Sequence, residues 1–598
     1  FGSSRRAQAI LRNTVRGALA ALSPMPFCRD SDSSSSSGDE VEDKDADRLS
    51  YVGQAAYDEL RTHHNHYWHE AWNVTSGRIV GEVHQTPAYL QGGRIVGTWG
   101  DPNDPRDGHS DWFPKKLGEI ISKTRYWCDI ASLGPPDGLF MEEMKKAIST
   151  VNQNAIERGE ENVVIIRVIF GNIIGMPVDC TAVLKELTSD IDEDECKIQM
   201  WVGAWRRGTS WNHAKIIAVD GKYLHTGGHN LWDPHYLKNN PVHDLSMQAE
   251  GRCTHDGHLY LNKQWEHIKH MQSGFVGWVV DHLPDRMPTI LQNRVTVTEF
   301  PENGETPEFP PTYTKDKVPF NHDGFQGHVP MITIGRYGKI LLKNRPSDQA
   351  FIAMVNASKK IIRMALQDIG PCCFPGTKIA LPGCTWPKPY LQALGKAILE
   401  RGVDLEIAVS NPGSIPGNLS PTEALYGNGW ECADVAAEII KTIRDEVDDG
   451  DDDTEDDAGL RRIITENLRI CYIRQGMTNQ WGDEKTMGMH AKHFIIDDMA
   501  YYIGSQNWYV CDLAEWGILI DDVNQTRKVI EEYWKPMWEN SYKEGDDADC
   551  DVDDVLDGLD IDRDGESMAF KSHSEKQRLL QEAAGNFGSS RARRGSSS

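Results

Sequence analysis

The chain has 598 residues, of which 39% are hydrophobic and 9% aromatic, enough for several domains or for a duplicated enzyme with a packed core. The formal net charge of −27 is concentrated in three acidic runs, 32–47, 445–457 and 546–566, so the remaining chain is near neutral and lacks the broad basic surface of a non-specific DNA binder. Since no apolar stretch approaches the roughly 20 residues of a transmembrane helix, we expect no integral membrane protein.

The two ends of the chain lack the periodicity of folded elements. Residues 1–50 are basic and then rich in Ser and acids, which predicts a disordered N-terminal tail. Residues 51–110 are rich in His, Trp and Gly, and we expect them to form an irregular N-terminal extension. Residues 546–598 are acidic and then basic, and they are predicted to be a C-terminal tail.

Strand and helix patterns alternate between residues 111 and 320, which we interpret as a first half. The segments 125–133 and 197–205 read as strands, and the unbroken apolar run in 162–171 predicts a strand that is buried on both faces. The segment 138–159 has helical spacing of its apolar residues and ends at a glycine, which is typical of a helix terminus.

The same order returns between residues 321 and 545, which we interpret as a second half. The expected elements are a helix, a strand, a helix and two strands, at 347–358, 359–367, 390–402, 403–410 and 468–475. A Pro-rich stretch around 300–345 is the predicted boundary, and the acidic run 445–457 is expected to be a solvated insertion between a helix and a strand. The alternation therefore predicts the α/β fold class, with mixed sheets covered by helices in each half.

A His-Lys-Asp pattern occurs twice and carries most of the information about function. The pattern HxK(x)4D, followed ten residues later by Asn, is found at His213, Lys215, Asp220 and Asn230 and again at His490, Lys492, Asp497 and Asn507. A lone His on a strand is more often a core or surface residue than a catalyst, but two matched copies indicate an internal duplication. Each motif aspartate also opens a predicted β-hairpin turn, Asp220-Gly221 or Asp497-Asp498.

These side chains suit a phosphodiester substrate if the halves pack face to face. Two lysines neutralise phosphoryl oxygens and two asparagine amides add hydrogen bonds. One imidazole attacks phosphorus to form a phosphohistidine, and the other protonates the leaving oxygen and then activates water or an alcohol. No cofactor is expected, because the lysines supply the positive charge; the absence of a CxxC pair also argues against a zinc site.

The paired motif with its downstream GG/GS-x-N element resembles the phospholipase D superfamily over roughly residues 110–545. The resemblance implies two pseudo-symmetric α/β/α halves with the active site at the interface between them. The resemblance implies a nucleophile and an acid/base at His213 and His490, with His213 favoured as nucleophile, and phosphate binding by Lys215, Lys492, Asn230 and Asn507. The first half has Gly228 where the family more usually has Ser, which removes one hydrogen bond.

The resemblance also implies an acid after each Asn that orients the imidazole of its own half. Glu515 fits this role, whereas Asp244 fits less well because it lies fourteen residues past Asn230 rather than eight. The motif residues Asp220 and Asp497 are expected to be mainly structural. Four further histidines crowd the first motif and are expected to be surface or supporting polar residues: His225, His229, His235 and His243.

The favoured function is hydrolysis or transphosphatidylation of a phospholipid by a phosphohistidine enzyme. Its partners would be a phospholipid or another phosphodiester, with peripheral membrane contact, and one chain would build a complete site as a monomer. Aromatic residues near the motifs suit a lipid interface, stacking on bases or a core. A metal-independent nuclease acting on single-stranded nucleic acid is the alternative, although the near-neutral body makes nucleic acid the weaker interpretation.

A protein of another class is the second alternative. Asp560, Asp562 and Asp564 have the spacing of an EF-hand loop, but Lys571 stands where the loop requires Glu. The segment is therefore either a weak calcium site or a solvated tail, and a non-catalytic structural or calcium-responsive protein is the corresponding function. The four Asn-x-Ser/Thr sequons permit a secreted or endomembrane location, slightly favoured over an organelle or the cytoplasm.

Overall fold

The computed structural model is described here from residue 45 to residue 561. Within that range it omits 93, 98, 100–108, 160–161, 174–175, 209, 239, 273–296, 303–307, 320–327, 339–344, 372–387, 418, 422, 428–429, 449–456, 477, 481–484, 510–512 and 560. The predicted N-terminal tail up to residue 44, the EF-hand-like aspartates and most of the acidic insertion lie outside the described residues. Every described residue belongs to one of the chain's two units, Lys44–Ser598.

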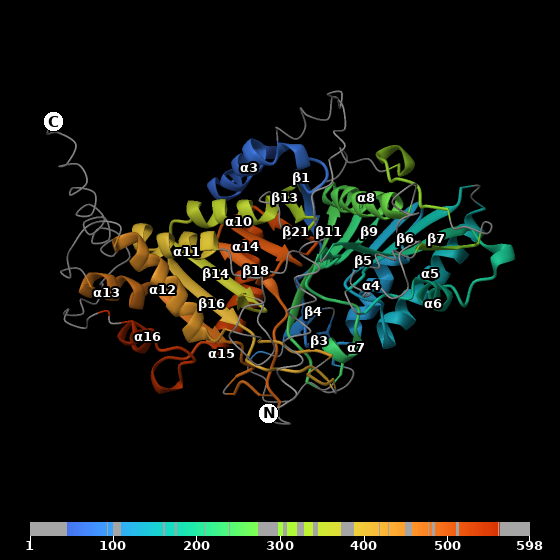
Figure 1. Ribbon diagram of the computed structural model, residues 1–598. Coiled ribbons are helices and arrows are strands. Elements are labelled where there is room, and N and C mark those ends of the chain that lie inside the picture. The colour runs from blue at the N-terminus through green and yellow to red at the C-terminus, as the bar shows by residue number, and fades with distance from the viewer. Residues whose placement is uncertain are drawn as a thin grey trace, which may run out of the picture. The chain divides into compact units, whose positions relative to one another are not determined.

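An antiparallel strand pair lies at the centre of a 17-stranded sheet. It consists of β1 (Trp72–Ile79) and β13 (Val329–Arg336), with Thr75 opposite Met331. Strand β11 (Asp244–Gly251) pairs with β1, and β21 (Glu515–Ile520) pairs with β13, both antiparallel. The sheet therefore extends outward from the centre in two directions (Figure 1).

The strand order is the same on both sides of this centre. One side continues from β11 to β10 (Tyr223–Gly227), β9 (Ile216–Val219), β5 (Trp127–Ser132), β6 (Val164–Gly171) and β7 (Ile198–Arg207). The other side continues from β21 to β19 (Ala500–Gly504), β18 (Lys492–Ile496), β14 (Ile361–Leu366), β16 (Asp404–Val409) and β17 (Leu468–Tyr472). On each side the last three of these strands are parallel and the others antiparallel, which is consistent with the duplication that the motifs predict. The first side has one further edge strand, β12 (Val297–Phe300), antiparallel to β7.

Helices cover both faces of the sheet (Figure 1). On the first side α4 (Trp112–Ile121), α5 (Gly138–Arg158) and α6 (Cys180–Leu187) share one apolar core with β5, β6 and β7. On the second side α10 (Pro346–Ala357), α11 (Lys388–Arg401), α12 (Cys432–Asp448) and α13 (Asp457–Asn467) do the same with β14, β16 and β17. The third core joins the two sides and contains α8 (Cys253–Gln272), η5 (Ile530–Trp534) and α15 (Lys535–Ser541).

Local sequence explains most of these elements. The buried residues of α5 recur at helical spacing from Phe140 to Ala155, and the helix ends at Gly159 in the left-handed conformation, φ 63°. The sequence-predicted strands and helices of both halves are confirmed with end shifts of a few residues, since β5, β6, β7, β14, β16 and β17 and α5, α10 and α11 lie in the expected segments.

Two expectations about organisation are wrong. Residues 51–110 are not merely irregular, because they contain α3 (Tyr51–His63) and the central strand β1. The stretch 300–345, the predicted boundary between the halves, contains β13. The acidic run 445–457 precedes helix α13 rather than a strand. Local pattern does not predict such short or half-polar segments, because pairing with distant strands determines whether they form strands.

The remaining elements are short or peripheral. They are η1 (Asn65–Tyr67), β2 (His84–Thr86), β3 (Ala88–Gln91), β4 (Arg94–Gly97), η2 (Glu193–Glu195), β8 (Ser210–Trp211), α7 (Asp233–Tyr236), β12 (Val297–Phe300), η3 (Lys315–Lys317), β15 (Ile369–Gly370), β20 (Trp508–Tyr509), α14 (Val523–Val529), η6 (Gly545–Asp547) and α16 (Val552–Gly558). None of the described helices combines the length and apolar character that a membrane crossing requires.

Candidate active site

The two motif histidines lie close together although they belong to different sides of the sheet. The rings of His213 and His490 have centroids 6.3 Å apart and an interplanar angle of 72°. Each histidine lies just before the first strand of its hairpin, β9 or β18. The backbone N–H of His213 donates to Ala514 O at 2.8 Å, and that of His490 donates to His243 O at 2.6 Å. Backbone pairing across the centre therefore fixes both rings.

Each imidazole is held by an acid from the opposite half. His213 Nδ1 lies 2.9 Å from Glu515 Oε2, at the start of β21. His490 Nδ1 lies 2.7 Å from Asp244 Oδ2, at the start of β11. The expectation that each acid orients the imidazole of its own half is therefore wrong. The pairing is crosswise because each motif segment runs beside the opposite half's acid-bearing strand.

The charges of the first histidine pair follow from burial. Burial lowers the pKa of His213 to about 4, although the Glu515 carboxylate opposes this shift. Burial alone would raise the pKa of Glu515, but His213, Arg336 and Lys215 together outweigh this effect and lower that pKa below its ordinary value. The ring is therefore neutral at pH 7 beside an ionised carboxylate. Its Nδ1–H donates to the carboxylate, which leaves the Nε2 lone pair for chemistry.

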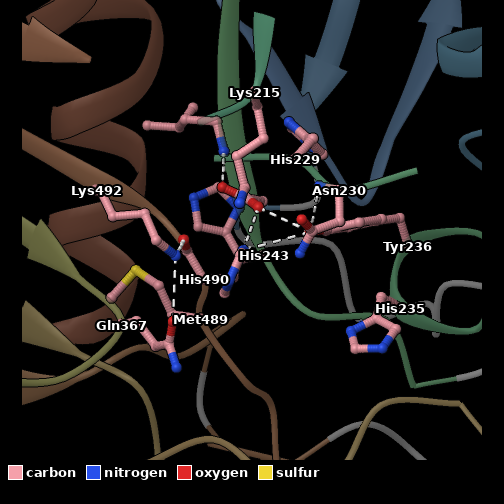
Figure 2. Close-up of polar contacts among 12 residues, drawn as sticks. Lys215, His229, Asn230, His235, Tyr236, His243, Gln367, Met489, His490 and Lys492 are labelled. Atoms are coloured by element: carbon pink, nitrogen blue, oxygen red, sulfur yellow. Dashed lines mark hydrogen bonds and ion pairs between the residues drawn. The ribbon is translucent and has the colours of Figure 1, made fainter. Parts of the chain in front are cut away.

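The motif lysines are buried beside the histidines. Lys215 Nζ donates to His213 O at 2.7 Å, and Lys492 Nζ donates to His490 O and, at 3.1 Å, to Gln367 Oε1 (Figure 2). Burial lowers the pKa of Lys215 to about 7 and that of Lys492 to about 8. Buried ammonium groups strongly favour an anion as a partner. Across the described residues, no three His, Cys, Asp or Glu side chains are grouped to hold a metal ion.

The motif asparagines follow the second strand of each hairpin. Asn230 comes after β10 and is 1% exposed, and neither polar atom of its side chain has a hydrogen-bond partner within the described part of the chain. Asn507 lies at the matching place after β19 and is 5% exposed. A buried amide without a partner is costly, so the Asn230 side chain is suited to hydrogen-bond a ligand.

The motif aspartates fasten each hairpin to its neighbouring strand. Asp220 accepts hydrogen bonds from the backbone N–H groups of Arg125, Tyr126 and Trp127 at the start of β5. Asp497 accepts three equivalent bonds from residues 359–361 at the start of β14. Both aspartates have positive φ, 53° and 55°, and the two hairpins are formed as predicted.

A tyrosine that sequence reasoning missed replaces a serine in the first half. In the second half Ser505 Oγ donates to Glu515 Oε2 at 2.6 Å. The matching position is Gly228, where a Cβ atom would lie 2.1 Å from Asp244 Oδ1. Asp244 instead receives the hydroxyl of Tyr236 at 3.0 Å. One sequence feature pointed to this difference: the spacing from Asn230 to Asp244 is six residues longer than that from Asn507 to Glu515. Helix α7, which carries Tyr236, lies within this longer segment.

The four additional histidines are buried, so a surface position is wrong for each: His225, His229, His235 and His243. His229 lies between Thr86 Oγ1 and Ser246 Oγ, at 2.8 and 2.7 Å. His235 Nδ1 lies 2.8 Å from Tyr426 Oη, and that tyrosine ring packs edge-on against His490 at 5.4 Å. They pack around the motif residues rather than facing solvent.

A loop from the second half closes over this region. The segment after β16 reaches the loop after α7, where Gly417 N–H donates to Asn240 O at 3.1 Å and Asn240 Nδ2 donates to Ile415 O. The motif histidines and lysines are each less than 5% exposed in this arrangement. The site is therefore shielded from bulk water, which strengthens the electrostatic interactions within it.

The chain is similar to one curated protein whose name agrees with the motif resemblance. A curated protein named Phospholipase D from Streptomyces antibioticus is 24% identical over 493 residues, covering 79% of this chain and 84% of that protein. A solved phosphatidylserine synthase from Haemophilus influenzae Rd KW20 covers 87% of this chain and 95% of its own, at 10% identity and a TM-score of 0.41. NucT from Helicobacter pylori covers 27% of this chain and 91% of its own, at 15% identity and a TM-score of 0.20. No protein-family model matches the chain.

Proposed function

We propose that this chain is a phosphodiesterase that acts through a covalent phosphohistidine. Its similarity to a curated phospholipase D supports its resemblance to the phospholipase D superfamily. The observation that carries the proposal is the pair His213 and His490, whose ring centroids are 6.3 Å apart and whose Nδ1 atoms are each held by a carboxylate. Two imidazoles this close together can act on one phosphoryl group from two sides.

The first step transfers the phosphoryl group to the enzyme. His213 Nε2 attacks phosphorus, forming a P–N bond as the bond between phosphorus and the leaving oxygen breaks. Burial and the neighbouring lysines lower the pKa of His490 well below its ordinary value in the free protein, so the step requires the bound phosphodiester anion to raise it again. The protonated His490 then gives its Nε2 proton to the leaving oxygen, with Asp244 stabilising the imidazolium. Lys215 and Lys492 neutralise the phosphoryl oxygens, and the free amide of Asn230 adds a hydrogen bond.

The second step releases the phosphoryl group. His490, now neutral, takes a proton from water or an alcohol as its oxygen attacks phosphorus. The P–N bond breaks and its electron pair returns to His213 Nε2. Glu515 stabilises the positive charge that this ring carries while it is phosphorylated. Water gives hydrolysis and an alcohol gives exchange, so one site performs both reactions.

We propose a phospholipid as the substrate, with release or exchange of its head group. The similarity to a curated phospholipase D over most of both chains supports this choice. The residues of the site would serve a nucleic acid equally well, so the test must include one.

The test is a turnover assay in EDTA with two substrates: phosphatidylcholine vesicles with ethanol, and a single-stranded oligonucleotide. We expect phosphatidylethanol from the wild type and its loss in His490→Ala. Glu119→Gln, an exposed acid on α4, serves as the control and should remain active. Cleavage of the oligonucleotide alone would favour the nuclease, and inactivity on both substrates would favour a non-catalytic protein.

A further inference from the structure

Tyr236 is the meeting point of three elements of the site. Its hydroxyl donates to Asp244 Oδ2 at 3.0 Å and accepts the backbone N–H of Asn230 at 3.0 Å. The same oxygen lies 3.3 Å from His490 Nδ1 (Figure 2). The side chain is 1% exposed, and burial raises its pKa well above the ordinary value, so the hydroxyl remains protonated. It therefore contacts the acid and the imidazole that the acid holds, together with the backbone of a motif asparagine.

The opposite pair is held differently. Ser505 donates to Glu515 and accepts the backbone N–H of Trp516 at 3.1 Å, but it has no counterpart in the first half, where Gly228 occupies the position. Any side chain there would collide with Asp244. The hydroxyl that the first half lacks next to its acid comes instead from helix α7, within the extra residues between Asn230 and Asp244.

We propose that Tyr236 is a positioning residue that holds the Asp244–His490 pair for proton transfer to the leaving alcohol, while Ser505 holds the Glu515–His213 pair for attack on phosphorus. The inference rests on the proposed function. In the first step of that reaction, the Ser505 hydroxyl would position the nucleophile and the Tyr236 hydroxyl the proton donor. Tyr236 acts through Asp244, because its hydroxyl occupies one lone pair of Oδ2 and leaves another directed at His490 Nδ1. Its bond from Asn230 N–H ties the same hydroxyl to the loop that carries the phosphate-binding amide.

This division of roles predicts a dependence on the leaving group. A poor leaving alcohol such as choline requires the proton from His490, whereas p-nitrophenol departs readily without one. Loss of the Tyr236 hydroxyl should therefore slow the release of choline much more than the release of p-nitrophenol. Loss of the Ser505 hydroxyl should slow both to a similar degree, because attack by His213 is needed in either case.

The experiment measures the release of the alcohol in a single turnover of the full chain, so that only the first step is observed. The substrates are phosphatidylcholine and phosphatidyl-p-nitrophenol, and the variants are Tyr236→Phe and Ser505→Ala. Tyr223→Phe on β10 is the control for removal of a tyrosine hydroxyl. For Tyr236→Phe we expect a loss of roughly ten- to hundredfold with phosphatidylcholine and less than about threefold with the p-nitrophenyl ester.

Thermal unfolding of each variant shows whether a loss of activity comes from misfolding or from a misplaced Asp244–His490 pair. The inference is supported if Tyr236→Phe unfolds like the wild type and loses much more activity with phosphatidylcholine than with the p-nitrophenyl ester. Equal losses with both substrates in Tyr236→Phe would overturn it while leaving the proposed function intact. A leaving-group dependence in Ser505→Ala instead would also overturn it. A wild type that releases neither alcohol would overturn the inference together with the proposed function.

Discussion

Glu515 Oε2 lies 2.9 Å from His213 Nδ1, although the two residues are 302 positions apart in the chain. The reciprocal contact joins His490 to Asp244 at 2.7 Å. Each half thus contributes a histidine to one pair and an acid to the other. Neither half contains a complete pair.

Replacing Glu515 by glutamine tests the first pair. The Gln side chain has the same shape, but it loses the charge that stabilises a positive ring, and its NH2 group can face Nδ1 and stabilise the wrong tautomer. We expect kcat to fall by about 10²- to 10⁴-fold in Glu515→Gln, measured in the vesicle assay. Glu119→Gln should leave kcat unchanged, and a Glu515→Gln enzyme within about threefold of the wild type would contradict this role.

The buried lysines predict an alkaline limit to substrate capture. Burial lowers the pKa of Lys215 to about 7 and that of Lys492 to about 8, so these groups lose their protons as the pH rises through that range. The neutral amine no longer attracts a phosphodiester anion. We expect kcat/KM, which reports the free enzyme, to fall above pH 7 to 8. A kcat/KM that stays constant from pH 7 to 10 would show that the lysines keep their charge.

The buried histidines predict a loss of stability in acid. Burial lowers the pKa of His84, His243 and His493 to about 4, and that of His225 well below its usual value. In the unfolded chain these rings titrate near 6.5, so protonation favours unfolding as the pH falls from 6.5 toward 4.

Carboxyl groups with a raised pKa oppose this trend. Burial raises the pKa of Asp256 and Asp521 to about 6, so their protonation favours the folded state as the pH falls through that value. Among the described residues nine histidines have a lowered pKa and six carboxyl groups a raised one, so we expect the urea midpoint to fall between pH 7 and 5. His225→Gln should reduce the fall, whereas His63→Gln, an exposed control, should not. A midpoint that does not change with pH would contradict this balance.

The motif aspartates predict a matched pair of stability defects. Asp220→Ala and Asp497→Ala each remove the acceptor of three backbone N–H groups and place alanine at a positive φ. We expect each to lower the free energy of unfolding by about 3 kcal/mol, measured by urea denaturation. Asparagine keeps one acceptor oxygen and tolerates positive φ, so the Asn variants should lose less. Losses below about 0.5 kcal/mol in the Ala variants would rule out this structural role.

The elements that could be predicted from the sequence are those determined by neighbouring residues in the chain. The hairpins of His213 and His490 could be predicted because strand alternation and turn residues lie within one short segment. Strand β1 could not, because its place depends on pairing with β13, more than 250 residues away. The crosswise contacts of Glu515 and Asp244 have no local signature either. Tyr236 was missed because a longer spacing shows that residues were inserted without showing what they touch.

The distance along the chain between His213 and its acid also sets the order of events during synthesis. Ribosomes add about 5–20 residues per second, so Glu515 is made roughly 15–60 s after His213. The nascent chain therefore carries His213 without its carboxylate partner for about half of its synthesis. We expect no phosphohistidine chemistry until nearly the whole protein has been translated, so a ribosome-stalled chain that ends before residue 515 should be inert.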